Sequence, residues 1–204
     1  CVVSPPFEEN CWIVGCPQPR EGIVIDPGDD VAGILAEVRS ARVRVGAILN
    51  THGHLDHVGG VAALREELAV PFRIHRADEF LLQTVARQAA LFGLPPPRPP
   101  TVDGYLEDGE EIGLGARALR VIHTPGHSPG GVVFYNPEQK ILIAGDVLFY
   151  GSIGRTDLPG GSFEQLTNNI KTKLLTLPEE TVVYCGHGPE TTIGFEKKNN
   201  PFLT

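Results

Sequence analysis

The sequence contains no methionine and only four cysteines among its 204 residues. Four cysteines are too few for a disulfide scaffold, and no Cys-x-x-Cys pair indicates a structural zinc ribbon. We therefore predict that all four thiols are reduced, which fits a reducing compartment such as the cytoplasm. Because the chain starts at Cys1 and has no methionine, we expect that the natural start is missing or was processed, and a lost leader segment stays open.

The chain also lacks a long apolar run and any basic cluster. No run approaches the ~20 apolar residues that a membrane span requires. The 17 basic and 25 acidic residues give a formal charge of −8 at pH 7, so the chain offers no electrostatic footprint for nucleic acid. We predict neither a membrane nor a nucleic acid as a partner, and the sequence leaves the oligomeric state open.

The composition is that of an ordinary globular protein, with 41% hydrophobic and 21% charged residues. The length predicts a single domain over residues 1–204. The glycine and proline contents, 24 and 18 residues, indicate many loops. The proline-rich run 95–100 predicts an extended surface connection rather than a domain linker, because chemical motifs fall on both sides of it.

The hydrophobic pattern predicts an α/β chain in two halves. Before the proline run we predict strands at Cys11–Val14, Gly22–Ile25, Val45–Leu49 and Phe72–Ile74, and helices at Val31–Arg39, Val61–Leu68 and Asp78–Phe92. After it we predict strands at Leu119–Ile122, Val132–Tyr135, Lys140–Ala144 and Thr181–Tyr184, and one amphipathic helix at Ser162–Leu177. Two mixed sheets packed together with helices outside is the economical architecture for this pattern.

The segment from His52 to His57 carries the strongest chemical signal. Three histidines and one aspartate fall within six residues, directly after a predicted buried strand. Neutral imidazole and carboxylate both donate to a divalent metal, which resolves the competition for protons among such close groups. Along an extended backbone His52 and His54 project the same way, whereas Asp56 and His57 begin the next turn and face a second point. The segment therefore predicts a metal site with room for two adjacent metals.

Three further residues become candidate ligands beside that cluster. His127, Asp146 and His187 each stand near the end of a predicted strand and next to a glycine, which permits close backbone approach. Alone, each would indicate only a turn or a solvated side chain. Because active sites are commonly built on loops at strand ends, we predict that all three join the metal site.

Four other residues have simpler interpretations. His75 follows a short strand and His123 ends one, so we predict structural roles for both. Asp26 ends a strand and either hydrogen-bonds to the ligand loop or forms a turn before Pro27, and the sequence leaves both open. We interpret Cys185 as a buried strand thiol, so no side-chain nucleophile is predicted.

Taken in order, these motifs resemble the metallo-β-lactamase superfamily, and within it the glyoxalase II group of hydroxyacylglutathione hydrolases. The early Asp26 also matches. The stretches that carry the resemblance span most of the chain: Thr51–Gly60, Thr124–Gly131, Gly145–Phe149, Gly151–Arg155, Gly186–Pro189, Thr191–Glu196 and Asn200–Phe202. The resemblance implies a metallo-β-lactamase fold, which is an αββα four-layer sandwich of two mixed sheets with helices on the outer faces and a metal site at one edge.

The resemblance also implies two divalent metal ions per chain. Family roles carried over would place the first metal at His52, His54 and His127 and the second at Asp56, His57 and His187, with Asp146 bridging both. The implied reaction is hydrolysis of a thioester such as S-lactoylglutathione to a hydroxy acid and a free thiol through a metal-bound hydroxide. Asp56 would orient that hydroxide and hold a proton. Zinc suits these ligands best in our interpretation, and iron or manganese also fits nitrogen and oxygen donors.

One departure from the family pattern concerns glutathione. Typical members continue into a helical C-terminal region that helps to hold glutathione, whereas this chain stops about where that region would begin. It resembles the short, one-domain bacterial members instead. Arg155 lies in the loop where the family often places a cationic contact, so we predict that it binds the carboxylate of the substrate. An arginine on a solvated loop is the open alternative.

Other activities on the same fold remain alternatives. A persulfide dioxygenase would hold one iron at His52, His127 and Asp146, and Gly154–Asp157 resembles that group. The context of Leu55 favours the hydrolases, among which a lactonase is a further alternative, and a non-enzymatic metal-binding protein is the last. The commonest β-lactamases have cysteine at the position of Asp146, and the tRNA-processing members act on RNA, so we expect neither activity from this acidic chain.

Overall fold

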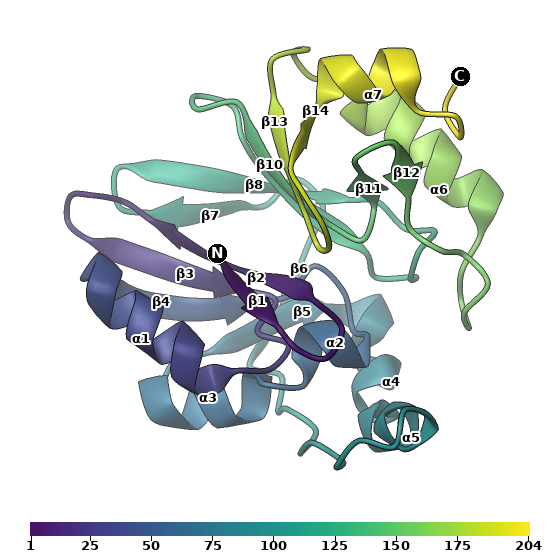
Figure 1. Ribbon diagram of the computed structural model, residues 1–204. Helices are drawn as coiled ribbons and strands as arrows, with labels where there is room; N and C mark the ends of the chain where they lie inside the picture. The colour runs from purple at the N-terminus through teal and green to yellow at the C-terminus, as the bar shows by residue number, and fades with distance from the viewer.

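Two six-stranded sheets face each other at the centre of the protein (Figure 1). A computed structural model describes residues 1–204. In the first sheet the spatial order of the strands follows the chain, β1 and β2 pair antiparallel, and β3 to β6 run parallel to one another. Its strands are β1 (Val2–Ser4), β2 (Glu9–Gly15), β3 (Glu21–Ile25), β4 (Arg44–Leu49), β5 (Phe72–His75) and β6 (Gly104–Leu106).

The second sheet has the spatial order β14-β13-β10-β9-β8-β7, in which only β10 and β13 pair in parallel. Its strands are β7 (Glu111–Leu114), β8 (Arg117–His123), β9 (Val132–Asn136), β10 (Ile141–Gly145), β13 (Val182–Cys185) and β14 (Thr191–Thr192). A separate small hairpin joins β11 (Leu148–Phe149) to β12 (Ser152–Ile153). Both large sheets are therefore mixed, as the sequence predicts.

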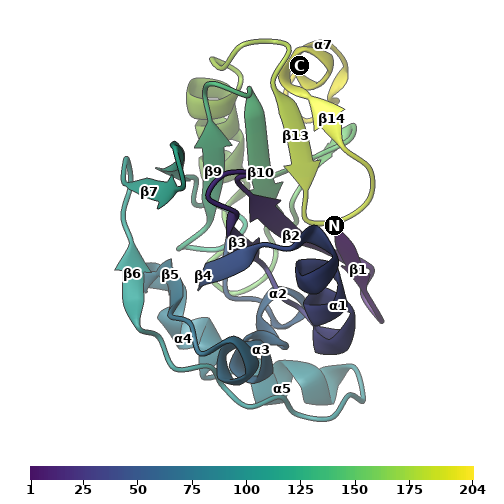
Figure 2. The same cartoon turned by 90° about the vertical axis from the view of Figure 1, so that its left-hand side faces the viewer.

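Helices complete the two outer layers (Figures 1 and 2). The first sheet is covered by α1 (Val31–Ala41) and α3 (Val61–Leu68), with α2 (Leu55–Val58), η1 (Arg76–Asp78), α4 (Glu79–Leu82) and α5 (Val85–Leu91) beside them. The second sheet is covered by α6 (Phe163–Asn169), its wider continuation η2 (Ile170–Leu174), and α7 (Ile193–Asn199). The predicted αββα sandwich is confirmed.

Alternation along the strands builds the layers, because successive side chains of a strand point to opposite faces. In β3, Val24 packs into the apolar cluster beneath α1 and α3, whereas Ile23 and Ile25 face the space between the sheets. In β9, Val133 packs towards α6, whereas Phe134 fills the space between the sheets. All five side chains are buried. The continuous apolar runs of these strands therefore serve two packed faces at once.

The predicted helix Asp78–Phe92 is wrong as a single element, because the chain divides there into η1, α4 and α5. The break lies at Thr84, whose hydroxyl donates to the carbonyl oxygen of Leu81 at 2.8 Å. A threonine hydroxyl that bonds to nearby backbone competes with regular helical hydrogen bonding. After the break, the Gln88 side chain accepts the backbone N–H of Leu55 at 3.0 Å, which ties α5 to α2.

The other predicted elements are present with small shifts at their ends. The predicted strands differ from the observed ones by one or two residues at an end, and the predicted helix Ser162–Leu177 is the shorter pair α6 and η2. The run 95–100 contains neither helix nor strand, as predicted. The elements that the sequence does not predict are short: β1, β6, β7, β11, β12, β14, α2 and α7. The apolar pattern of an element of two to seven residues is too short to show a clear period.

One edge of the sandwich is fastened by contacts between the sheets. The Val132 N–H donates to the carbonyl oxygen of Thr51 at 2.8 Å. Trp12, the single tryptophan, lies on β2 and donates its Nε1–H to the carbonyl oxygen of Cys185 at 3.1 Å. Its ring centre lies 4.8 Å from that of Tyr184 on β13. These contacts join the end of β4 to the start of β9 and β2 to the end of β13, next to the predicted ligands.

The cysteines form no disulfide bond. Cys1 is exposed, and the other three are buried with free thiols, as the sequence predicts. None of the helices combines the length and apolar character that a membrane crossing needs.

Candidate metal centre

The seven predicted ligands gather at one edge of the sandwich, in α2 and in the loops that follow β4, β8, β10 and β13. Parallel pairing of β3 with β4 and of β10 with β13 brings the carboxyl ends of those strands together. Gly145 permits the close approach of the two sheets. Its φ is +47°, and a Cβ at this position would lie 2.2 Å from Thr51 Oγ1. Only glycine is free of both the steric clash and the backbone strain.

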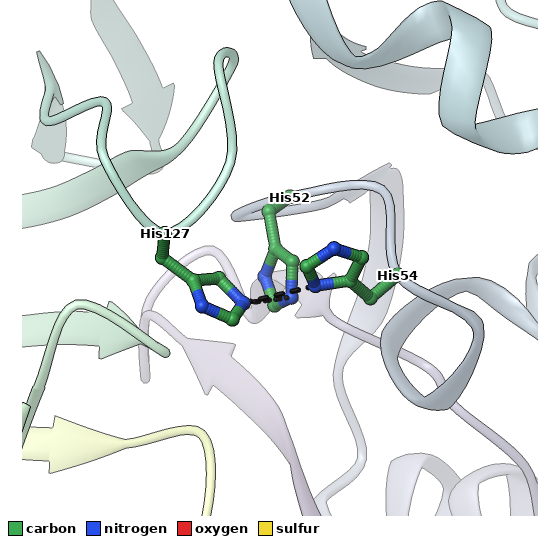
Figure 3. Close-up of side chains that lie close together, drawn as sticks. All are labelled: His52, His54 and His127. Atoms are coloured by element: carbon green, nitrogen blue, oxygen red, sulfur yellow. Dashed lines mark hydrogen bonds between the residues drawn. The ribbon is translucent and has the colours of Figure 1, made fainter. Parts of the chain in front are cut away.

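The first group consists of His52, His54 and His127, whose rings turn towards one another (Figure 3). His127 Nε2 lies 2.9 Å from His54 Nδ1 and 3.2 Å from His52 Nε2. All three residues are buried. The two sheets contribute to the group together, since the first two ligands follow β4 and the third follows β8.

The second group consists of Asp56, His57 and His187. Asp56 Oδ2 lies 3.3 Å from His187 Nε2 and 3.9 Å from His57 Nε2. Asp146 stands between the two groups, because its Oδ1 lies 3.3 Å from His57 Nε2 and its Oδ2 lies 3.7 Å from His127 Nε2. The carboxylate thus faces a histidine of each group, which is the place that the sequence predicts for it.

The outward-facing ring nitrogens reveal which nitrogens carry hydrogen. His127 Nδ1 lies 2.8 Å from the carbonyl oxygen of Arg155, and a carbonyl only accepts, so Nδ1 carries the hydrogen. His52 Nδ1 lies 3.1 Å from the Thr51 hydroxyl, which itself donates to Asp26. His52 Nδ1 therefore also carries a hydrogen. The Nε2 lone pairs of His52 and His127 consequently point at each other across 3.2 Å.

The second group repeats this arrangement. His57 Nδ1 donates to Asp26 Oδ2 at 3.1 Å, and His187 Nδ1 donates to the carbonyl oxygen of Phe7 at 3.2 Å. Their Nε2 atoms therefore turn inwards to carboxylate oxygens. His57 Nε2 and Asp146 Oδ1 are buried without a hydrogen-bond partner. The facing lone pairs of His52 and His127 repel unless a cation lies between them. The imidazole nitrogens and carboxylate oxygens of the second group are also metal donors, so the whole set fits divalent metal.

Burial and the neighbouring charges set the protonation of these groups. Burial, together with the adjacent imidazoles, lowers the pKa of His52 well below its usual value and that of His54 to about 4. Both are therefore neutral at pH 7, which is the form that binds metal. Burial opposes ionisation of Asp146, but the imidazoles around it, above all His57, hold its pKa below the usual value. For His57, burial is outweighed by Asp146 and Asp56, which raise its pKa.

Asp26 supports the ligand loop from behind. It is buried and accepts hydrogen bonds from the Thr51 N–H at 2.7 Å, the Thr51 hydroxyl at 2.6 Å and His57 Nδ1. Of the two roles that the sequence leaves open, the structure has the hydrogen-bonding one. The residue adopts a φ of +54°, an uncommon conformation for a side chain other than glycine.

Asp78 fastens two ligand loops to each other, and sequence reasoning missed it. Its buried carboxylate accepts hydrogen bonds from the Gly53 N–H at 3.0 Å, the Ser128 hydroxyl at 2.7 Å and the Gly130 N–H at 2.6 Å. Gly53 separates two ligands of the first group, and Ser128 follows the third. The available signal was an acidic residue at the start of a helix, which is too common to single out.

The remaining residues of interest lie around this centre. His75 and His123 stack on each other, with ring centres 4.1 Å apart, and neither belongs to a ligand group, in line with their predicted structural roles. Arg155 lies beside the first group, but its guanidinium makes two hydrogen bonds to Asp157, at 2.8 and 2.7 Å. Glu9, which the sequence did not single out, is fully buried, and its carboxyl oxygens have no hydrogen-bond partner. Glu9 Oε1 lies 4.0 Å from His57 Nδ1, and burial raises the pKa of the carboxyl to about 10.

Comparison with known proteins places this geometry in a family. A family model described as the metallo-beta-lactamase superfamily matches residues 4–187. The hydroxyacylglutathione hydrolase GloC of Haemophilus influenzae is 38% identical over 204 residues, which cover 97% of this chain and 93% of that protein. Among solved structures, TTHA1623 in a di-iron-bound form is 43% identical, with a TM-score of 0.90 and coverage of 99% of this chain and 98% of that one. The BLEG-1 B3 metallo-beta-lactamase is 38% identical, with a TM-score of 0.92 and coverage of 100% and 98%. The chain therefore belongs to the metallo-β-lactamase superfamily.

Proposed function

We propose that the protein is a metal-dependent hydrolase that cleaves a thioester such as S-lactoylglutathione to a hydroxy acid and a free thiol. One observation carries the proposal: four imidazoles donate outwards through Nδ1 to oxygen atoms and turn their Nε2 atoms inwards, where three carboxylate oxygens face them. The 38% identity to a protein named hydroxyacylglutathione hydrolase supports the substrate class.

In this proposal each group would hold one divalent cation, and Asp146, which faces a histidine of each group, would be a ligand shared by the two. The di-iron form of the related TTHA1623 supports two cations per chain. Zinc, iron and manganese all suit nitrogen and carboxylate ligands, and zinc is our first choice. When bound, such cations supply Lewis acidity, which lowers the pKa of water and polarises a carbonyl oxygen. No nucleophilic side chain is then needed, and Cys185 is buried with its pKa raised by burial to about 12.

Asp56 is the residue of the site best placed to handle the proton. Although burial opposes its ionisation, His57 and His187 lower its pKa, so it is a carboxylate at pH 7. Its side chain is 23% exposed, whereas that of His57 is fully buried, so Asp56 faces the side from which water and substrate arrive. We propose that it orients the attacking water, accepts a proton from it and returns a proton to the departing thiolate.

Arg155 is the proposed contact for a carboxylate of the substrate. Its carbonyl oxygen accepts from His127 Nδ1 at 2.8 Å, which places its backbone next to the first group. The guanidinium is 62% exposed and bonded to Asp157, so a substrate carboxylate would compete with that residue for it. This competition predicts a modest rather than a dominant contribution to binding.

The decisive test is hydrolysis of S-lactoylglutathione by purified protein of known metal content, followed by loss of the thioester absorbance. Turnover with close to two metals per chain is expected. A fully loaded protein that hydrolyses no thioester would refute the proposal. The panel should include a lactone and a β-lactam, because one similar structure is named a metallo-beta-lactamase. A single bound iron with oxygen uptake on a persulfide would instead favour the dioxygenase, which needs only His52, His127 and Asp146.

A further inference from the structure

A pocket of about 340 Å³ lies beside the second group of ligands. Its walls come from the loop between β1 and β2, from the start of α2, from the end of α5 and from the proline run after it. Small-molecule sites typically enclose about 300–1,000 Å³, so this volume suits part of a small substrate. Of the seven predicted ligands, only Asp56 lines it.

The pocket adjoins the metal centre at Asp56. Asp56 is one of its lining residues and also belongs to the second group. Phe7 also lines the pocket, and its carbonyl oxygen accepts the Nδ1–H of His187 at 3.2 Å. Two ligands of the second group thus adjoin the pocket, one directly and one through the backbone of Phe7. A molecule that reacts at the centre can therefore extend into this space.

The lining combines apolar side chains with polar groups, and it has no positive charge. The side chains of Phe7, Leu55, Ala89 and Leu94 contribute to it, together with five prolines. The ring of Phe7 packs edge-to-face on that of Phe92 at 4.9 Å, which holds this wall in place. The only charged residues of the lining are acidic, so a carboxylate would meet repulsion there and an uncharged apolar group would not.

Arg155 lies beside the first group, where its carbonyl oxygen accepts from His127 Nδ1. The pocket is lined by Asp56 of the second group and by Phe7, which contacts His187. A glutathione thioester has carboxylates on its thiol half and none on a simple acyl half. The charge pattern therefore directs the thiol half towards Arg155 and leaves the pocket for the acyl half.

We propose that this pocket binds the acyl group of the substrate and selects apolar acyl chains larger than lactoyl, such as hexanoyl or phenylacetyl. The inference rests on the proposed thioester hydrolysis and specifies its substrate class. The apolar side chains and the proline rings of the lining gain contact with each added methylene of an acyl chain. The hydroxyl of a lactoyl group has only Ser4 and the two carboxylates as side-chain hydrogen-bond partners there.

The first experiment measures binding without catalysis. S-hexylglutathione and S-methylglutathione are thioethers, so they cannot be hydrolysed, and calorimetry gives their dissociation constants with or without metal. The hexyl compound is expected to bind at least about tenfold more tightly, a typical effect of several methylenes in an apolar pocket. Equal affinities would overturn the pocket assignment.

The second experiment compares kcat/KM for acetyl-, lactoyl-, hexanoyl- and phenylacetyl-glutathione in three proteins. Pro96→Trp places a large ring at the exposed rim of the pocket and is expected to remove most of the preference for hexanoyl. Leu91→Trp is the matched control, because Leu91 is 78% exposed and does not line the pocket. Leu94→Ala enlarges the pocket and is expected to shift the preference to longer chains, which keeps the test open if Pro96→Trp fails to fold.

The outcomes separate the two proposals. If the wild-type protein with bound metal hydrolyses none of the four thioesters, the proposed function fails, and the binding series still tests the pocket. If all four are hydrolysed with similar kcat/KM, or if Pro96→Trp slows all four equally, the hydrolase stands and the acyl pocket is wrong.

Discussion

The hydrogen bonds from Gly53, Ser128 and Gly130 to Asp78 join two ligand loops and are here called the clamp. Replacing Asp78 by alanine tests whether the clamp supports both the stability of the fold and metal binding. The carboxylate accepts three hydrogen bonds, two from backbone N–H groups and one from a hydroxyl, and it is fully buried. A buried donor that loses its acceptor costs about 1–3 kcal/mol. Burial raises the pKa of Asp78, so removing the carboxylate also relieves a desolvation cost. We therefore expect the lower end of this range for each of the three donors, which is a total loss of about 3 kcal/mol in the free energy of unfolding.

The assay combines thermal unfolding with metal titration. For a chain of this length, about 3 kcal/mol corresponds to a fall of about 6–12 °C in Tm. Because the clamp joins the loop of His52 and His54 to the turn of His127, the metal affinity of the first group is expected to fall about tenfold, as for other residues that orient ligands. Asp78→Asn keeps one acceptor oxygen, so its Tm and its metal affinity should lie between those of the wild type and those of Asp78→Ala.

Asp103→Ala is the matched control. Asp103 also accepts three hydrogen bonds, two from Arg65 and one from the Phe72 N–H, but it does not touch the ligand loops. The Asp103→Ala substitution should lower Tm without changing the metal affinity. The reasoning would be refuted by an Asp78→Ala protein whose Tm and metal affinity match the wild type. It would equally be refuted if Asp103→Ala weakened metal binding as much.

Three other predictions concern the ligands, the arginine and the thiols. His54→Ala should remove one of two metals and most of the activity, measured by metal analysis and thioester hydrolysis; unchanged metal content and rate would contradict its assignment as a ligand. Arg155→Ala should raise KM for a glutathione thioester more than for a small neutral thioester, and Asp157→Ala should lower the first KM by freeing the guanidinium; equal effects on both substrates would reject the contact. A thiol reagent should modify only Cys1 in the folded protein, because the other three cysteines are buried, and mass spectrometry would show any further adduct.

The ligand residues could be predicted because each one carries a local signal. The cluster from His52 to His57 is dense enough to indicate a metal by itself, and the other three ligands stand beside glycines at strand ends. The resemblance to the superfamily then supplied their grouping, and the structure brings the same residues together. The continuous apolar run 45–49 likewise indicated a buried strand.

What the sequence could not predict depends on contacts between distant segments. Asp78 looks like an ordinary residue at a helix start until Gly53 and Ser128 fold against it. Glu196 looks like a surface residue of a charged segment, yet it is buried and accepts hydrogen bonds from the Thr191 hydroxyl and the Gly151 N–H. It thereby holds the β11–β12 hairpin to α7, two elements too short to show a period of their own.

The position of Trp12 gives the protein an intrinsic fluorescent probe at the edge of the sandwich where the predicted ligands gather. The indole belongs to one sheet, yet its hydrogen-bond acceptor and its aromatic neighbour both belong to the other. That acceptor is the carbonyl of Cys185, two residues before His187. Any parting of the sheets at this edge, or any shift of the His187 loop, changes the surroundings of the only indole in the chain. Its fluorescence can therefore follow, without a label and in real time, how the two halves of the sandwich respond as metal is added or withdrawn.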